Sequence, residues 1–318
     1  MEHFRSKPDL SVVTPCYNEA DGVLAFYEML RSTLERQGCS HEIIFVDDGS
    51  TDDTLPILNR IADANERVVV LSLTRNFGHQ AALTAGMDHA RGRMILVMDS
   101  DLQHPPELIP QMIRELATGA DVVYAVRQET AGSGLFKRIT SNGFYALMNR
   151  FGAAPFIPGA ADFRLLSERA NESIRQMRET HRFLRGLVTW TGYPAKVISY
   201  RANPRGAGKS KYTWSKMIRL AFDATFSFSV LPLRFVTGLG LALIGLGLAY
   251  LVYILVGVIA WPESVQPGWP SVIASLLVLS GVQLLSLGVI ATYVGMIFEQ
   301  VKGRPLYVLK QGRPTNED

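Results

Sequence analysis

The sequence predicts an α/β domain with a mostly parallel, doubly wound sheet, followed by two helices that cross a membrane. Through the first part of the chain, short apolar runs alternate with helix-like patterns at intervals of about 25 residues, as in repeated βα units. The last third contains two long stretches without a charged residue. Each is longer than the roughly 20 apolar residues that span a bilayer.

Five apolar runs are expected to form the strands of the sheet: Leu10–Thr14, Glu42–Val46, Val68–Leu73, Met94–Met98 and Val122–Ala125. The segments between them have helical periodicity, and helices are expected at Gly22–Gln37, Asp53–Asn65, Gln80–Ala90 and Pro106–Thr118. Because right-handed crossovers join parallel strands, the loops that follow the strands should meet along one edge of the sheet. Three of these loops are polar: Pro15–Asp21, Asp47–Asp53 and Asp99–Pro106.

The two uncharged stretches, 235–262 and 272–298, are expected to form a transmembrane hairpin. Basic residues precede the first stretch and follow the second, which is the pattern of cytoplasmic flanks. The N-terminus is polar and has no apolar stretch of signal-peptide length, so the large domain should stay in the cytosol. The chain is therefore expected to be a multi-pass protein of the inner (plasma) membrane with both termini cytoplasmic. The expected divisions are a cytosolic domain at 1–212, a juxtamembrane amphipathic helix at 213–231, two transmembrane helices at 232–300 and a cytoplasmic tail at 301–318.

Composition excludes several other classes of protein. The formal net charge of +3 over 318 residues is too small to favour nucleic acid as a partner, and the positive residues gather near the membrane. Cys16 and Cys39 are the two cysteines, and neither belongs to a CxxC spacing. A disulfide framework or a structural zinc site is therefore not expected.

The segment Asp99-Ser100-Asp101 follows an apolar run and offers carboxylates at the carboxyl edge of the expected sheet. Asp99, Asp101 and Gln103 alternate along the chain, so an extended backbone points all three in the same direction. Their oxygens are hard ligands suited to one Mg²⁺ or Mn²⁺ that holds a diphosphate, and open α/β sheets bind ligands at this edge. The alternative is a solvated strand end before a helix that begins with two prolines.

Six segments carry a family resemblance. Ser11–Glu19, Val46–Asp52 and Asp99–Glu107 resemble motifs of the family 2 inverting glycosyltransferases, which use nucleotide-diphospho-sugars. With the two expected spans, three more segments are similar to the polyprenyl-phosphate glycosyltransferases: Asn76–Gln80, Asp162–Leu165 and Arg205–Tyr212. The bactoprenol glucosyltransferases of the GtrB type are most similar, and the dolichyl-phosphate mannose synthases are a step further away. The resemblance covers almost the whole chain and its motifs stand in the expected order.

The resemblance implies a nucleotide-sugar-binding domain of the GT-A type, followed by amphipathic interface helices and a two-helix transmembrane hairpin. It also implies a homotetramer. Within the domain it implies that Asp48 reads the uracil edge and that the donor site includes Pro15, Tyr17, Glu19, Gln80, Asp99 and Ser100. Two simpler interpretations stay open: the Asp47–Asp52 segment caps the following helix, and Asn76–Gln80 is only a turn.

The resemblance also gives roles to the groups nearest the chemistry. It assigns the metal to Asp99, Asp101 and Gln103, with Asp99 contacting either ribose or metal, and it leaves His104 out of the metal set. Asp101, Asp162 and Arg205 are the candidate catalytic residues. Asp162 is a candidate base or orienting group, although an Asp that opens a strand is equally often structural.

Phosphate groups on donor and acceptor should require fixed positive charge. Candidates for binding the diphosphate or the acceptor phosphate are Arg127, Lys137, Arg138, Arg205, Lys209, Ser210 and Lys211. Alternatively, the basic residues near the membrane contact lipid headgroups, and Lys137 and Arg138 extend their charged ends toward the interface. Residues 214–228 interleave basic and apolar side chains, which is typical of a helix lying in the interface plane.

The expected reaction is the inverting transfer of glucose from UDP-glucose to polyprenyl (undecaprenyl) phosphate. The acceptor is already an anion near pH 7, since a phosphomonoester has a second pKa of about 6, so little deprotonation is needed. Alternatives are the same reaction with GDP-mannose or a UDP-aminoarabinose derivative, and a membrane-anchored, catalytically silent scaffold. The intact Asp99, Asp101, Gln103 and Arg205 argue against the scaffold. A processive polysaccharide synthase would need more spans and a QxxRW-type motif.

Overall fold

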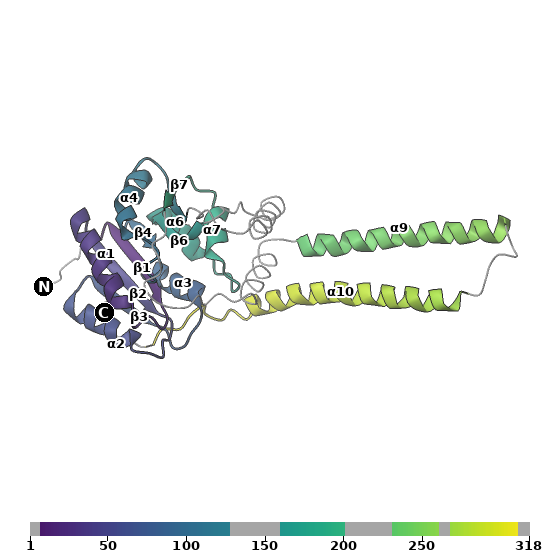
Figure 1. Ribbon diagram of the computed structural model, residues 1–318, viewed down its shortest axis with the longest axis horizontal. Helices are drawn as coiled ribbons and strands as arrows, with labels where there is room; N and C mark the ends of the chain where they lie inside the picture. The colour runs from purple at the N-terminus through teal and green to yellow at the C-terminus, as the bar shows by residue number, and fades with distance from the viewer. Residues whose placement is uncertain (1–6, 128–159, 201–230, 261–267, 311–318) are drawn as a thin grey trace.

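The computed structural model describes residues 7–127, 160–200, 231–260 and 268–310, and it consists of an α/β domain from which two long helices extend (Figure 1). The strands of the domain form one seven-stranded sheet in the order β3-β2-β1-β4-β6-β5-β7. The strands are β1 (Leu10–Cys16), β2 (His41–Asp47), β3 (Val68–Ser72), β4 (Met94–Val97), β5 (Val122–Arg127), β6 (Ala160–Ser167) and β7 (Ala195–Tyr200). Both pairings of β6 are antiparallel and the other four are parallel.

Helices cover both faces of the sheet, which confirms the doubly wound α/β expectation. On one face, a core that includes Phe26, Leu58 and Met112 packs beneath α1 (Val23–Gln37), α2 (Thr54–Ala64) and α4 (Ile109–Ala117), the last preceded by the 3₁₀ turn η1 (Pro106–Leu108). On the other face, a second core packs beneath α3 (His79–His89), α6 (Glu168–Gln176) and α7 (Leu184–Trp190). All the expected strands and helices of the first 118 residues and β5 are present, with ends shifted by a few residues.

The sheet is less regular than expected because β6 runs opposite to its neighbours β4 and β5. Asp162 lies within β6 instead of opening it, and both Asp162 and Arg164 are buried there at 1% exposure. Two buried charges make this central strand unlike the apolar run that a parallel-sheet strand usually shows. The seventh strand, β7, is an edge strand whose first three residues are exposed, so it also lacks that apolar signal.

One edge of the sheet collects most of the chain's polar loops. The six strands that share one direction end there, and β6 begins there. The described chain leaves this edge at Arg127 and at Tyr200 and re-enters it at Ala160. Residues that follow or precede these points therefore connect to the domain at this edge, as the sequence predicts for a doubly wound sheet.

The two long helices are α9 (Leu231–Ala260) and α10 (Trp269–Val301), which contact each other and extend from the same side of the domain (Figure 1). Within α10, the 23 residues Leu279–Val301 are long and apolar enough to cross a membrane. Leu284 is 70% exposed and Phe298 is 61% exposed, so this is not a buried core helix. Such an exposed apolar surface indicates a membrane anchor.

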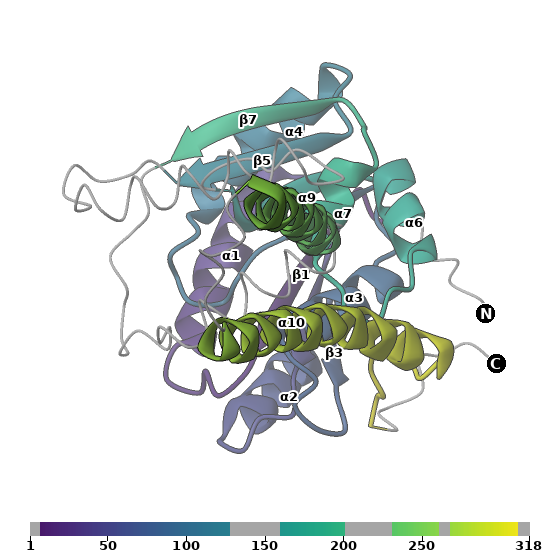
Figure 2. The same ribbon diagram turned by 90° about the vertical axis from the view of Figure 1, so that its right-hand side faces the viewer.

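The other expected membrane features are described only in part. In α9 the apolar segment Phe235–Gly247 is shorter than a span among the described residues. The expected interface helix at 214–228 lies outside the described residues, as does most of the segment 261–270 that joins the two expected spans. Figure 2 views the molecule from its membrane-helix end, with β7 and β3 on opposite sides of the domain.

The residues after α10, 302–310, return to the domain and form a C-terminal strap on its edge strand. Leu309 bridges Leu73 in antiparallel fashion just beyond β3. Two backbone hydrogen bonds flank this bridge: the Thr74 N–H donates to the Val308 carbonyl at 2.9 Å, and the Lys310 N–H donates to the Ser72 carbonyl at 2.7 Å. The strap covers part of an otherwise open sheet edge. An uncovered edge strand can pair with another chain and so promote aggregation.

Side chains also fix the end of α10 to the domain. The Gln300 amide accepts from the Thr180 N–H at 2.7 Å and donates to the Arg178 carbonyl at 3.1 Å. The Tyr307 hydroxyl donates to Asp88 at 2.9 Å, and Asp88 also pairs with Arg178. The membrane helix and the α/β domain are thereby joined at a defined place.

Replacing Tyr307 tests the strap. The Tyr307→Phe variant loses one hydrogen bond to a carboxylate that keeps its pair with Arg178, so the free energy of unfolding should fall by about 1 kcal/mol. Thermal unfolding in detergent micelles measures this difference. Tyr253→Phe, at a side chain that is 73% exposed on α9, is the control and should unfold like the wild type. Equal unfolding of both variants would contradict a stabilising strap.

Candidate active site

The loops after β1 and β2 are clasped together by side-chain hydrogen bonds. The Asn18 side-chain oxygen Oδ1 accepts from the Thr51 N–H at 2.9 Å, while the Asn18 backbone N–H donates to the Ser50 hydroxyl at 3.1 Å. The Glu19 N–H donates to the Thr54 hydroxyl at 2.8 Å. Asn18 adopts a positive φ of 52°, which Asn tolerates better than most residues. This clasp leaves the Tyr17 side chain 40% exposed at the sheet edge.

Asp48, at 3% exposure, holds the loop that leads into α3. Its carboxylate accepts from the Phe77 N–H at 2.8 Å and from the Gly78 N–H at 3.0 Å. Burial raises the pKa of Asp48 despite these two bonds. The loop also comes so close to Gly49 that a Cβ there would lie 2.5 Å from the Arg75 carbonyl carbon, and Gly49 has a φ of +68°. Glycine is thus required beside Asp48.

The helix-cap interpretation fits Asp52 alone, which binds the N–H of the first residue of α2, while the N-cap residue Asp53 makes no side-chain cap hydrogen bond. Asp52 accepts from the Thr54 N–H at 3.0 Å, and Asp47 accepts from the Ser50 N–H at 3.0 Å and the Ser72 hydroxyl at 3.0 Å. These two carboxylates order the loop before α2. Asp48 instead binds the loop before α3, through the Phe77 and Gly78 N–H groups.

Asp99, Ser100 and Asp101 follow β4 directly. The Ser100 hydroxyl donates to the Pro15 carbonyl at 3.1 Å and joins the ends of β1 and β4. Asp101 accepts from the Gln103 N–H at 3.1 Å across Leu102, whose φ of +63° is a strained conformation for a side chain of this size. Such strain is most often found at functional sites.

Two observations bear on a divalent cation at this loop. The Asp99 Oδ1 atom is buried and has no hydrogen-bond partner in the described part of the chain, so one hard oxygen is left unsatisfied. The Gln103 Oε1 atom accepts from Arg127 at 3.2 Å, and an amide oxygen has a second lone pair. Among the described residues there is no cluster of three His, Cys, Asp or Glu side chains suited to a metal. A cation here would rely on two carboxylates and an amide.

His104 has a structural place beside this loop. It is 4% exposed and stacks on Phe163 with ring centroids 5.0 Å apart. Its Nδ1 atom lies 3.1 Å from the Asp99 N–H and accepts from it. Because Nδ1 is used in this way and the ring is packed between aromatic groups, His104 fits the role of a support for Asp99.

Asp162 is the centre of a buried cluster of charges. Arg164 donates to its Oδ1 atom, Arg185 donates to both oxygens at 3.2 and 2.9 Å, and His79 Nε2 lies 3.2 Å from Oδ2. Burial opposes ionisation of this carboxyl, but the positive charges of Arg185 and Arg164 and the contact with His79 outweigh it and hold the pKa of Asp162 well below 3.8. A carboxylate so stabilised is a poor proton acceptor and a good orienting group.

Gln80, the expected donor-site residue on α3, has a structural partner. Its side-chain carbonyl accepts from the Leu184 N–H at 2.8 Å and so joins α3 to the start of α7. Cys16, at the end of β1, is also inert as a nucleophile because burial raises the pKa of its thiol to about 12. The chemistry of this edge therefore rests on carboxylates, amides and cations.

The structure brings most of the predicted residues to one edge of the sheet: Pro15, Tyr17, Glu19, Asp48, Asp99, Ser100, Asp101, Gln103, Arg127 and Asp162. Gln80 lies on α3, and the other candidates lie outside the described residues: Lys137, Arg138, Arg205, Lys209, Ser210 and Lys211. Sequence reasoning missed three members of the charged cluster, His79, Arg164 and Arg185. Arg164 stands two residues after Asp162 in a motif that was recognised, whereas Arg185 had no local signal.

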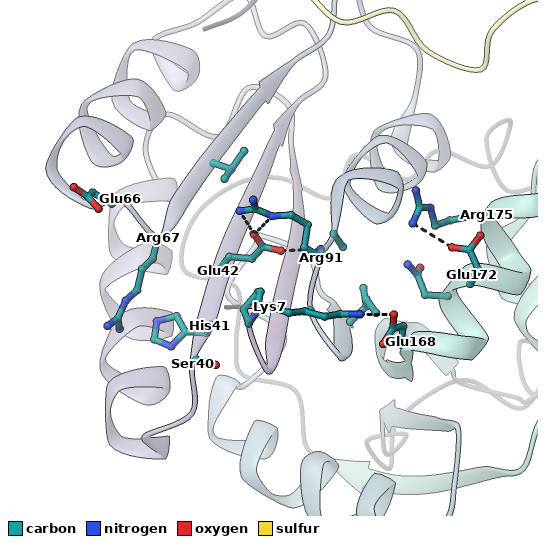
Figure 3. A pocket seen from close by; sticks show the side chains of 16 residues that line it. Lys7, Ser40, His41, Glu42, Glu66, Arg67, Arg91, Glu168, Glu172 and Arg175 are labelled. Atoms are coloured by element: carbon teal, nitrogen blue, oxygen red, sulfur yellow. Dashed lines mark hydrogen bonds and ion pairs between the residues drawn. The ribbon is translucent and has the colours of Figure 1, made fainter. Parts of the chain in front are cut away.

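A separate hollow of about 720 Å³ lies at the opposite edge of the sheet, where the parallel strands begin (Figure 3). Six of its charged side chains form three pairs. Glu42 accepts from Arg91 at 3.1 Å, Lys7 pairs with Glu168, and Arg175 pairs with Glu172 at 3.2 Å. The Lys7–Glu168 pair links the segment before β1 to α6, and the Glu42–Arg91 pair links β2 to the loop after α3, so these pairs have a structural role.

Comparison with known proteins defines the class. The family model described as glycosyl transferase family 2 matches residues 11–175, and the chain therefore belongs to the family 2 glycosyltransferases. The sequence is 38% identical over 301 residues to the uncharacterized glycosyltransferase YkcC of Bacillus subtilis (strain 168), covering 95% of this chain and 93% of that protein. It is also 38% identical over 307 residues to the SfII prophage-derived bactoprenol glucosyl transferase of Shigella flexneri, covering 96% of this chain and 99% of that one.

A solved structure supports the fold. Mannosyl-3-phosphoglycerate synthase from Rubrobacter xylanophilus superposes with a TM-score of 0.50 at 20% identity, over 68% of this chain and 71% of that one. At this identity the similarity concerns the architecture alone. The α/β domain with its mixed sheet is thus of the GT-A-like kind, and a long apolar helix follows it.

The charged cluster predicts a defined pH dependence of stability. The Asp162→Asn variant leaves Arg164 buried without its counter-charge, so at pH 7 the free energy of unfolding should fall by about 3–5 kcal/mol. Because the folded pKa of Asp162 lies below its usual 3.8, this contribution is complete above that pH and disappears as pH falls through the folded pKa. The difference in the free energy of unfolding between variant and wild type should therefore become smaller below pH 3.8, as measured by urea unfolding.

Asp101→Asn makes the same chemical change at a half-buried carboxylate that accepts from a backbone N–H. It serves as the control and should cost less than about 1.5 kcal/mol at pH 7. If the loss of unfolding free energy in Asp162→Asn stays constant from pH 7 to acid conditions, this would contradict the ionised, ion-paired state of Asp162.

Proposed function

We propose that this glycosyltransferase transfers glucose from UDP-glucose to polyprenyl (undecaprenyl) phosphate, with inversion at the anomeric carbon, and releases UDP. The observation that carries the proposal is the pair Asp99 and Asp101 at the carboxyl edge of the sheet, in a chain whose α/β domain is followed by the exposed apolar helices α9 and α10. A water-soluble donor and a membrane-bound acceptor are the substrates that such a chain can bring together. The 38% identity to a protein named as a bactoprenol glucosyl transferase supports the choice of sugar and lipid.

The donor nucleotide would bind at the ends of β1, β2 and β4. Asp48 has an acceptor carboxylate suited to a nucleobase N–H, and exposed Tyr17 offers a ring face nearby, with Pro15, Glu19 and Ser100 completing the wall. In this arrangement Gln80 supports the site from behind, through its bond to the Leu184 N–H.

Asp99, Asp101 and Gln103 would hold one Mg²⁺ or Mn²⁺. The unsatisfied Asp99 Oδ1 atom and the hard-oxygen donor set fit such an ion. When bound, the ion would neutralise charge that develops on the leaving diphosphate. Arg127, which donates to the Gln103 side chain, adds a fixed positive charge at the same place.

The transfer needs no general base from the protein. An oxygen of the acceptor phosphate forms the new bond to the anomeric carbon, while the bond from that carbon to the donor's β-phosphate oxygen breaks and UDP leaves with the electron pair. The acceptor oxygen is already anionic, since its second pKa is about 6. The low pKa of Asp162 fits this scheme, because Asp162 stays ionised and orients Arg164, Arg185 and His79 instead of taking up a proton.

The acceptor phosphate would be bound by cations on the segments that join the domain at this edge. The described chain leaves this edge at Arg127 and at Tyr200. The candidates follow one or the other of these residues in the sequence, which favours this location. The candidates are Lys137, Arg138, Arg205, Lys209, Ser210 and Lys211. Arg205 is the one we assign to the transfer step, where it would stabilise charge on the phosphates.

The membrane part is proposed to be a two-span hairpin in the inner membrane, with the domain and both termini in the cytoplasm. Support comes from the length of α9, the contact of α9 with α10 and the uncharged stretch 235–262. Residues 213–231 would lie along the interface, and the family resemblance favours a homotetramer. No nucleic acid partner is proposed.

A transfer assay tests the reaction. Purified protein in detergent is incubated with undecaprenyl phosphate and UDP-glucose, GDP-mannose or a UDP-aminoarabinose derivative, and lipid-linked sugar is measured by mass spectrometry. Product is expected from UDP-glucose with Mg²⁺ or Mn²⁺, and EDTA should abolish it. Asp101→Asn should lower kcat/KM by about 10²–10³-fold, the range for losing one preorganised electrostatic contact at a developing charge.

Product from a different donor would change the assignment of the sugar. Absence of product from every donor, although UDP still binds, would contradict the proposal and favour a silent scaffold. Glu107→Gln, an acidic residue in the η1 turn after the same loop, is the control for the Asp101 variant and should keep full activity.

Cysteine accessibility tests the hairpin. A cysteine introduced at Glu263, in the expected tip, should react in intact spheroplasts with a maleimide that does not cross the membrane, because the tip faces away from the cytoplasm. A cysteine at Asn316 should react only after permeabilisation. Cys16 is buried, and Cys39, in the α/β domain, is replaced by serine for this measurement. Reaction of both sites, or of neither, in intact spheroplasts would contradict a two-span hairpin.

A further inference from the structure

His79 occupies a position that the reaction scheme does not yet use. It is the first residue of α3, and its side chain is 43% exposed at the active edge. One atom of its ring, Nε2, faces two carboxylates at once: it lies 3.2 Å from Asp162 Oδ2 and 3.6 Å from Asp99 Oδ1. A single N–H therefore stands between the buried ion cluster and the first carboxylate of the Asp-Ser-Asp loop.

The proton on Nε2 follows from its partners. Asp162 is ionised because its pKa is held well below 3.8, and an ionised carboxylate only accepts hydrogen bonds. Nε2 must then be the donor in this contact, whether or not the ring carries a second proton. The argument needs the N–H alone and does not depend on the charge of the ring.

The two carboxylates differ in the other hydrogen bonds that they accept. Asp162 also receives one bond from Arg164 and two from Arg185, so it stays well satisfied without His79. The Asp99 Oδ1 atom is buried and has no hydrogen-bond partner among the described residues. On its other side, Oδ2 lies 3.8 Å from His104 Nε2, beyond hydrogen-bond length. Turning the His79 N–H from Asp162 toward Asp99 thus costs little and satisfies an orphaned oxygen.

His79 is also tied to the nucleotide side of the edge. It directly follows Phe77 and Gly78, whose N–H groups are held by buried Asp48. The same loop lies in backbone contact with Gly49. A change in the nucleobase pocket at Asp48 would therefore be transmitted to the His79 ring over two residues of chain.

We propose that His79 is a positioning residue of the transfer reaction: its Nε2–H turns from Asp162 to Asp99 Oδ1 and so orients Asp99 toward the divalent cation that would hold the donor diphosphate. This proposal rests on the proposed function, since it assigns that cation to Asp99. His79 touches neither substrate in this scheme and acts through Asp99.

Two substitutions at His79 distinguish the loss of its hydrogen-bond donor from a change in side-chain volume. His79→Gln keeps a side-chain N–H at about the distance of Nε2, whereas His79→Leu keeps the volume and removes the donor. In the transfer assay, His79→Leu should lower kcat by about 10- to 100-fold, the rate equivalent of one hydrogen bond to a charged group. His79→Gln should recover to within about threefold of the wild type, since the bond is restored.

Binding measurements test the role of His79 independently of turnover. Titration calorimetry with UDP in EDTA should give the same Kd within about twofold for wild type and both variants, because His79 does not contact the nucleotide. At saturating UDP, the Kd for Mn²⁺ should rise by about tenfold in His79→Leu and stay near the wild-type value in His79→Gln, because Asp99 loses its orientation only in the former. His89→Gln, at the far end of α3, is the control and should match the wild type in every measurement.

The outcomes are distinguishable from a failure of the proposed function. If the wild type makes no lipid-linked sugar from any donor, the proposed reaction is wrong. If the wild type is active and His79→Leu keeps its kcat, the positioning role is wrong. It is also wrong if Gln and Leu variants lose activity equally, or if the Kd for UDP in EDTA rises as much as kcat falls.

Discussion

The buried carboxylate of Asp162 is the constraint around which the active edge is built. It lies at 1% exposure on the one antiparallel strand of the sheet and accepts from Arg164, Arg185 and His79, which come from β6, α7 and α3. An unpaired charge at this depth would be strongly destabilising, so these three elements must meet where they do. The same pairing keeps Asp162 ionised, which suits a reaction whose nucleophile arrives as an anion.

The proposed reaction sets a second constraint, because its donor is soluble and its acceptor stays in the bilayer. The C-terminal strap addresses this constraint, because Gln300 and residues 307–310 bind the end of α10 to the α/β domain. An enzyme with the proposed activity would have to bring an anionic headgroup to the active edge, and it would benefit from such a defined attachment, since positioning supplies much of the rate in reactions of this kind. The strap also covers the β3 edge, so anchoring and stability share the same contacts.

The amino-acid pattern predicts the regular part of this fold well. The strands β1 to β5 and helices α1 to α4 follow from their apolar periodicity, and the polar loops after β1, β2 and β4 meet as expected for parallel strands. The direction of β6 was not predicted, because its buried Asp162 and Arg164 depend on partners distant in sequence. For the same reason the roles of His79 and Arg185 became visible only once three elements were in contact. Periodicity cannot report such long-range charge pairing.

The anomeric configuration of the product tests the central claim most directly. Direct displacement by the acceptor phosphate, with Asp162 neither a base nor a nucleophile, converts the α-linkage of UDP-glucose into a β-linkage. We predict that NMR coupling constants of the lipid-linked product will show β-glucosyl phosphate as the sole anomer. An α-linked product would mean two displacements or a different geometry of attack, and would contradict this mechanism.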